Sequence, residues 1–134
     1  MAEKLHLEII TPNSVLLTED VETFEAPGVD GEFQILPGHT PYLTGLRIGS
    51  VSYSIAGEKK HISISGGFCE VQADKTVILA HTAEYAHTID ITRAKEAKSR
   101  AEKRIESDDT SIDTDRAKIS LLRAINRINV ASIK

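Results

Sequence analysis

Five arginines lie in two segments near the C-terminus, among small apolar residues. The first segment begins at residue 89 and reads IDITRAKEAKSRAEKR, and the second reads LLRAINR. The arginines are Arg93, Arg100, Arg104, Arg123 and Arg127. A cluster of guanidinium groups is suited to phosphate oxygens, because each planar fork offers paired N–H donors. The alternative is a solvated helix surface, which is the usual place of such side chains.

The spacing of these arginines favours convergence if the two segments form an antiparallel pair of helices. Arg93 and Arg100 are seven residues apart, so they differ by only about 20° around a helix axis. Arg123 and Arg127 are i,i+4 neighbours. Like charges gathered in one volume repel each other, so an anion between them would favour the folded hairpin. The solvated alternative stays open, because Glu96 and Arg100 are also spaced as an ordinary surface ion pair.

Other site chemistry has little support. The five histidines are scattered without ligand spacing, so we expect no metal. The segment SGGF at 65–68 lacks the lysine and the following helix of a phosphate loop, and its two glycines indicate a bulge or a close backbone approach. Cys69 has no evident activating partner, and as a single cysteine it excludes an internal disulfide. We therefore expect no catalytic residues.

Composition narrows the class of protein. The 134 residues are 40% hydrophobic and 27% charged, which is typical of a soluble globular chain. A net charge of -4 with no basic tract, and only three Phe, three Tyr and no Trp, argue against a nucleic-acid partner. No apolar run approaches the ~20 residues that span a bilayer, so we expect no membrane insertion. The N-terminus lacks the pattern of a targeting segment, so we expect the chain to act in the compartment where it is made.

The first part of the chain alternates with a period of two. Eight short strands are predicted, separated by Pro, Gly and Asp turns: LHLEII, SVLLTE, VETFEA, EFQIL, VSYSI, HISISG, FCEVQA and TVILAH. Strands at this regular spacing predict an antiparallel β-sandwich or flattened barrel. We place this domain at residues 1–84.

The remainder, residues 85–134, has a helical period and predicts an antiparallel two-helix hairpin, joined by a linker at about 83–88. The first helix is expected to begin at Thr88 or Asp90 and the second at Asp113 or Thr114, since these residue types cap helices. We expect an interface stripe of Ala94, Ala97, Ala101 and Ile105, facing an apolar arc of Ile119, Leu122, Ile125 and Ile128. Alanine buries little surface, so docking of the hairpin on the sandwich should be marginal.

Three motifs carry a resemblance to a known family. EFQILPGHTPYLTGL, ISISGGFCEV and IDITRA occur in this order, and with them the chain resembles the epsilon subunit of bacterial F-type ATP synthases from end to end. The resemblance implies a non-catalytic central-stalk subunit, peripheral on the cytoplasmic face of the bacterial inner membrane. It implies that the sandwich binds the gamma subunit and the c-ring. It also implies that the extended hairpin enters the alpha/beta catalytic head and blocks ATP hydrolysis.

The resemblance also suggests site residues. It places Glu32 and His39 near polar loops of the c-ring; the alternative is a rigid turn in which His39 bonds locally. Some bacterial members bind ATP at a motif [IL]-D-x-x-R-A, which is complete here at 89–94. The ATP-binding residues implied by the resemblance are Glu84, Asp90, Arg93, Arg100, Arg123 and Arg127. The arginines would take the phosphates, while Asp90 and Glu84 would hold the adenosine part or orient neighbours.

Binding of this kind would act through linkage. ATP that binds only the folded hairpin, at ten times Kd, stabilises it by ~1.4 kcal/mol. We expect no required cofactor, and the dependence of ATP binding on Mg²⁺ stays open. Three alternatives also stay open: the same subunit without physiological ATP binding, a free-standing sandwich adaptor whose hairpin docks another partner, and a small nucleotide hydrolase.

Overall fold

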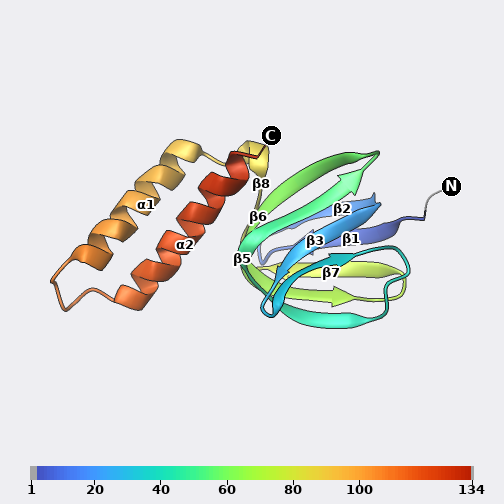
Figure 1. Cartoon of the computed structure of the whole chain (residues 1–134), viewed down its shortest axis with the longest axis horizontal. Helices are drawn as coiled ribbons and strands as arrows, with labels where there is room; N and C mark the ends of the chain where they lie inside the picture. Colours follow the sequence, from blue (N-terminus) through green and yellow to red (C-terminus); the bar gives the residue numbers. More distant parts are fainter. Residues whose placement is uncertain (1–2, 134) are drawn as a thin grey trace.

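The computed structural model describes residues 3–133, in which a two-layered β-sandwich is followed by a hairpin of two helices that projects to one side (Figure 1). This confirms the predicted fold class. The strands are β1 (Leu5–Ile10), β2 (Val15–Val21), β3 (Thr23–Gly28), β4 (Gly31–Ile35), β5 (Tyr42–Ile55), β6 (Glu58–Val71), β7 (Lys75–Ala80) and β8 (Ala83–Tyr85). The helices are a short 3-10 turn η1 (Ala86–Thr88), α1 (Ile91–Glu106) and α2 (Thr114–Ala131).

Strands β5 and β6 are 14 residues each and run through both layers (Figure 1). The strand order is β2-β1-β7-β6-β5-β3-β4, with β8 paired to β6. The pairs are antiparallel except β1 with β7, which is parallel. The prediction of eight short strands was therefore wrong in detail: VSYSI belongs to a longer β5, and HISISG and FCEVQA form one strand. The strand continues because Gly66 and Gly67, at φ of +99° and +150°, let it bend without ending.

Gly67 marks the close backbone approach that the sequence predicted. A Cβ atom at this position would overlap the carbonyl oxygen of Leu79 and lie 2.9 Å from the Cα of Ala80, both on the neighbouring strand β7. The glycine pair is therefore structural, as expected.

The core is mainly aliphatic, as the scarcity of aromatic residues predicted. Its largest fully buried side chains include Phe24, Leu7, Ile9, Ile62, Ile64 and Ile78. Cys69 is also buried there, and burial raises the pKa of its thiol to about 12. The thiol therefore stays protonated and unreactive near neutral pH, in line with the expectation of no nucleophile.

Aspartates begin both helices, one from each predicted pair of alternatives. The carboxylate of Asp90 accepts the backbone N–H of Arg93 at 3.1 Å, and that of Asp113 accepts the backbone N–H of Arg116 at 3.1 Å. Thr88 instead donates its hydroxyl to the carbonyl of Tyr85 within η1. The helix starts therefore agree with prediction, because side-chain capping is a local signal.

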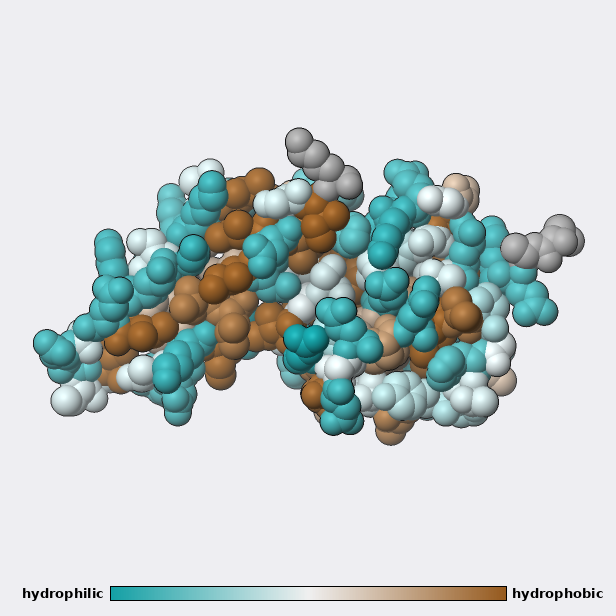
Figure 2. Space-filling model, viewed as in Figure 1, coloured by the Kyte–Doolittle hydropathy of each residue, from teal (hydrophilic) through white to brown (hydrophobic). Residues whose placement is uncertain are grey.

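Alanines on both helices form the interface of the hairpin. Ala94 and Ala101 of α1 and Ala117 and Ala124 of α2 are buried. The predicted apolar arc of α2 was wrong for Ile119 and Leu122, which are 45% and 56% exposed, whereas Ile125 and Ile128 are half-buried. Because small residues on both helices allow a close approach, Ile119 and Leu122 lie outside the interface. Hydrophobic residues consequently remain visible along the hairpin (Figure 2).

We expect Gly67→Ala to destabilise the sandwich by on the order of 3 kcal/mol or more, because its methyl group would meet backbone atoms that cannot move away. Gly57→Ala is the matched control: Gly57 also has a positive φ, +78°, but a Cβ there meets nothing within 4 Å. It should lose only about 1 kcal/mol. Urea unfolding of both variants measures this, and equal losses would contradict the assignment of Gly67 to a close approach.

The exposed cluster on β1 and β2 predicts a pH effect. His6 Nδ1 lies 2.9 Å from Oδ1 of Asp20, and His6 Nε2 lies 3.4 Å from Oε1 of Glu8. The pKa of His6 is raised above 6.5, chiefly by the hydrogen bond to Asp20. The cluster therefore adds stability below pH 6.5, and this is lost as pH rises through the folded pKa. We expect Asp20→Asn to lower the pKa of His6 in an NMR titration. The neighbouring Glu19→Gln should leave it nearly unchanged; an equal shift would contradict the pairing.

Candidate functional site

Helix α2, rather than α1, makes the main contact of the hairpin with the sandwich. Asn126 is at the centre of this contact. Its side-chain amide donates to the carbonyl oxygen of Gly49 at 2.9 Å and to the hydroxyl of Ser63 at 3.0 Å, and it lies 3.5 Å from the carbonyl oxygen of Ile64. One polar side chain of the hairpin thus contacts both β5 and β6.

The next residue along α2 forms an ion pair with the sandwich. Arg127 donates Nε–H to one carboxylate oxygen of Glu84 at 2.6 Å and Nη2–H to the other at 3.1 Å. Glu84 lies in β8, where it is paired in register with Ser63 of β6. The two side chains are 29% and 34% exposed, so solvent screens the pair only in part.

A cavity of about 410 Å³ opens beside this ion pair, between β6, β8 and the hairpin. Its lining combines the ion pair, small side chains and hydroxyl groups: Ser63, Ile64, Ser65, Thr82, Glu84, Ala97, Ser120, Arg123, Ala124 and Arg127. Three of the predicted ATP-binding residues, Glu84, Arg123 and Arg127, are therefore brought together. A guanidinium at each of two positions beside hydroxyl groups is suited to an anionic ligand.

The other three predicted residues lie elsewhere around the hairpin. Arg93 and Arg100 are exposed on α1 and, within residues 3–133, do not line this cavity. The carboxylate of Asp90 caps α1. The physical reason is that α1 packs mainly on α2, so much of its polar surface faces solvent.

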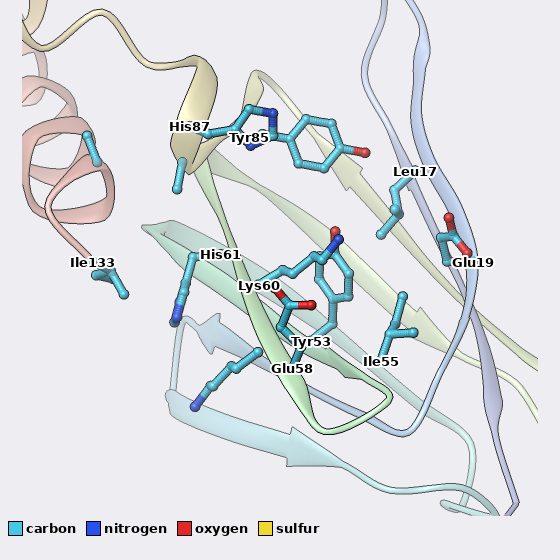
Figure 3. A pocket seen from close by; sticks show the side chains of 13 residues that line it. Leu17, Glu19, Tyr53, Ile55, Glu58, Lys60, His61, Tyr85, His87 and Ile133 are labelled. Atoms are coloured by element: carbon cyan, nitrogen blue, oxygen red, sulfur yellow. The ribbon is translucent and has the colours of Figure 1, made fainter.

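A second cavity, of about 660 Å³, lies at the base of the hairpin (Figure 3). Its walls come from the sandwich, from η1, from Ala131 at the end of α2 and from Ile133, which follows that helix and faces the cavity. Tyr85 stacks on His87 with ring centroids 5.5 Å apart, and its hydroxyl donates to the carbonyl of Leu16 at 2.9 Å. This fixes the start of the linker to β2. Sequence reasoning missed this cavity, although the aromatic pair in the bridge AEYAHT was a signal.

Burial shifts the pKa of two side chains that line this second cavity. Desolvation raises the pKa of Tyr53 to about 12. Desolvation, followed by the nearby Lys59 ammonium, lowers the pKa of His61. Both groups therefore favour their neutral forms near neutral pH.

Of the two residues predicted to face the c-ring, Glu32 lies in β4 and His39 lies in the loop between β4 and β5. The Glu32 side chain is 78% exposed, with Oε1 3.8 Å from Nη2 of Arg47. His39 Nδ1–H donates to the carbonyl of Thr40 at 2.6 Å, and its ring lies edge-on to Tyr42. His39 thus makes the local bond of the rigid-turn alternative, while Glu32 projects into solvent.

An exposed apolar row crosses one face of the sheet. In register across four adjacent strands, Val15 is paired with Ile10, Ile10 with Leu79, and Leu79 with Phe68. Val15, Leu79 and Phe68 are 60%, 50% and 58% exposed. We call these four residues the apolar stripe. Sequence reasoning did not single it out, because exposure on a sheet depends on strand neighbours distant in sequence.

Residues 3–133 contain no group of three or more His, Cys, Asp or Glu side chains that could hold a metal ion. The same residues form no helix that is long and apolar enough to cross a membrane.

A solved structure shares the fold. One chain in the Euglena gracilis mitochondrial ATP synthase assembly of OSCP, F1 and c-ring matches with a TM-score of 0.81 at 23% identity, covering 92% of this chain and 78% of that one. At this identity the likeness establishes the fold.

Sequence relatives and family models identify the family of the chain. The chain is 46% identical to the ATP synthase epsilon chain of Nitratidesulfovibrio vulgaris strain DP4 over 97% of both chains, and 46% identical to that of Desulforamulus reducens over 98% and 99%. It is 43% identical to that of Geobacter metallireducens over 98% and 96%. Residues 4–86 match the β-sandwich domain, and residues 87–132 the long α-helix domain, of the ATP synthase delta/epsilon chain. The chain therefore belongs to the ATP synthase delta/epsilon chain family.

Proposed function

We propose that the chain is the epsilon subunit in the central stalk of a proton-translocating F-type ATP synthase, peripheral on the cytoplasmic face of a bacterial inner membrane. The observation that carries this is the match over both domains, together with 43–46% identity to epsilon chains over nearly their full length. Family membership makes the chain a non-catalytic ATP synthase subunit. Its proposed role is then to connect the gamma subunit with the c-ring and to inhibit ATP hydrolysis.

The sandwich offers two surfaces for these partners. The apolar stripe, with Leu79 and Phe68 half exposed or more, suits burial against the gamma subunit, since apolar area removed from water is the main favourable term in association. The polar region with the exposed Glu32 and with His39 suits the polar loops of the c-ring.

The hairpin is proposed to inhibit ATP hydrolysis when it leaves the sandwich and extends into the alpha/beta head. Two features support this. The interface between the helices is built from alanines, and Ile119 and Leu122 remain exposed on α2. Such side chains are available to pack against another subunit once the hairpin extends.

The cavity beside Glu84 is proposed to bind regulatory ATP. Arg123 and Arg127 supply positive charge inside it, and the hydroxyls of Ser65 and Thr82, which are hydrogen-bonded at 2.7 Å, supply polar groups. Arg93 and Arg100 would join the site by reorienting their long exposed side chains. Asp90 would act by fixing the first turn of α1. ATP bound in this way bridges sandwich and hairpin and favours the folded, non-inhibitory form.

Calorimetric titration of the isolated chain with ATP and then ADP tests the nucleotide site. We expect one ATP site, with affinity reduced on the order of tenfold or more by Arg93→Ala and by Arg127→Ala, because each removes a charge-assisted hydrogen bond worth about 1.5–3 kcal/mol. Arg116→Ala, a change of the same charge at an exposed residue of α2 that does not line the cavity, is the control. Absence of binding up to millimolar ATP would leave the stalk function standing and remove the nucleotide site.

Binding of a purified gamma subunit tests the apolar stripe. We expect Phe68→Ser and Leu79→Ser each to weaken binding by about tenfold or more, because each removes about 1.5–3 kcal/mol of apolar burial. Both side chains are exposed in the isolated chain, so folding should be little affected. Lys60→Ser, an exposed position near the other end of β6, is the control. Unchanged affinity in both stripe variants would place the gamma contact elsewhere.

A further inference from the structure

We propose that Asn126 and the Glu84–Arg127 pair form a clasp that holds the hairpin against the sandwich by the chain's own groups. The clasp is independent of nucleotide binding. Only the role that the clasp gives Glu84 in the nucleotide site rests on the proposed function.

The amide of Asn126 is the first half of the clasp. Gly49 and Ile64 face each other across β5 and β6, and Ser63 precedes Ile64. The Nδ2 group therefore reaches acceptors on two paired strands at once. An amide nitrogen has two N–H donors, so both are satisfied by the sandwich. Loss of this residue removes bonds from the interface without opening the core, which Asn126 does not enter.

The ion pair is the second half. Glu84 is held in β8 by pairing with β6, so its carboxylate moves with the sandwich, whereas Arg127 moves with α2. The two parallel N–H···O bonds fix both distance and orientation. Because Asn126 and Arg127 are adjacent, the amide bonds of Asn126 and the ion pair of Arg127 act on the same turn of α2.

Two cavities flank the clasp. The cavity of about 410 Å³ lies on the Arg127 side, and another of about 380 Å³ lies on the Asn126 side, between α2 and Arg47 and Ile48 of β5. Close packing is therefore interrupted on both sides of the contact line. The hydrogen bonds of the clasp connect α2 to the sandwich between these two cavities.

The clasp also distinguishes two roles for Glu84 in the proposed nucleotide site. Two N–H groups of Arg127 are directed at Glu84. Glu84 is therefore a positioning residue for Arg127, rather than a contact to the adenosine part. The remaining N–H groups of Arg127, which has five donors in all, are those available to a phosphate.

Distance measurements on the whole chain test the clasp, with neither nucleotide nor partner subunits present. Spin labels are attached through Ser99→Cys on α1 and Thr18→Cys on β2, both exposed positions. The buried Cys69 thiol remains protonated and should stay unlabelled. We expect one dominant, narrowly distributed distance in the parent chain, because docking fixes α1 relative to β2. A broad distribution without a dominant distance in the parent would overturn the proposal.

Variants of the clasp are compared with matched changes on the same helix. We expect Asn126→Ala to raise the undocked-to-docked ratio about tenfold. Asn126→Asp keeps the shape but removes the donor, so it should raise the ratio at least as much. Asn129→Ala, a change at an exposed residue of the same helix, should leave the ratio unchanged. Equal ratios in the Asn126 and Asn129 variants would overturn the proposal.

The ion pair is tested by charge exchange. We expect Arg127→Gln and Glu84→Gln each to increase undocking about tenfold, and Arg116→Gln to leave the ratio unchanged. The exchange Glu84→Arg with Arg127→Glu should restore docking relative to Arg127→Glu alone. Absence of any restoration would overturn the ion-pair half of the clasp. Amide exchange across β1–β7 shows that the sandwich stays folded in each variant. Because no nucleotide is added, a failure to bind ATP cannot produce these results.

Discussion

The bend of β6 is the constraint on which much of the rest depends. Gly66 and Gly67 allow the strand to cross from one layer to the other while β7 approaches too closely for a side chain at Gly67. Before the bend, Ser63 and Ile64 present acceptors to α2 and pair with β8. After it, Phe68 joins the apolar stripe. One strand thus connects the docking site of the hairpin with the surface proposed for gamma.

The two domains differ in how they are held. The sandwich encloses an aliphatic core, whereas the hairpin is joined by alanines and contacts the sandwich mainly through α2. Apolar burial stabilises in proportion to area, so the hairpin depends more on directed polar bonds. Such bonds are individually modest because water competes for the same groups. Contacts of this kind suit a hairpin that, under the proposed function, leaves the sandwich and returns.

The arginine-rich hairpin is balanced by particular carboxylates. Glu84 engages Arg127 across the interface, and Asp90 and Asp113 cap the two helices. Arg123 lines the cavity near the ion pair, while Arg93 and Arg100 face solvent. The positive charge is therefore distributed around the hairpin. A phosphate ligand could contact all four arginines only if Arg93 and Arg100 of α1 reoriented toward the cavity. Ligand binding would then depend on how the two helices are packed together.

Local signals in the sequence determined the elements and the family. Alternation predicted strands, aspartates predicted both helix starts, and the glycine pair predicted a close approach, because each depends on residues near in the chain. Motifs over both domains led to the epsilon family. Tertiary structure alone decided how long β5 and β6 run, which face of α2 is buried, and which side chains meet. Asn126 has no sequence signal because its acceptors are 62 to 77 residues away. The apolar stripe likewise exists only once β1, β2, β6 and β7 are in register.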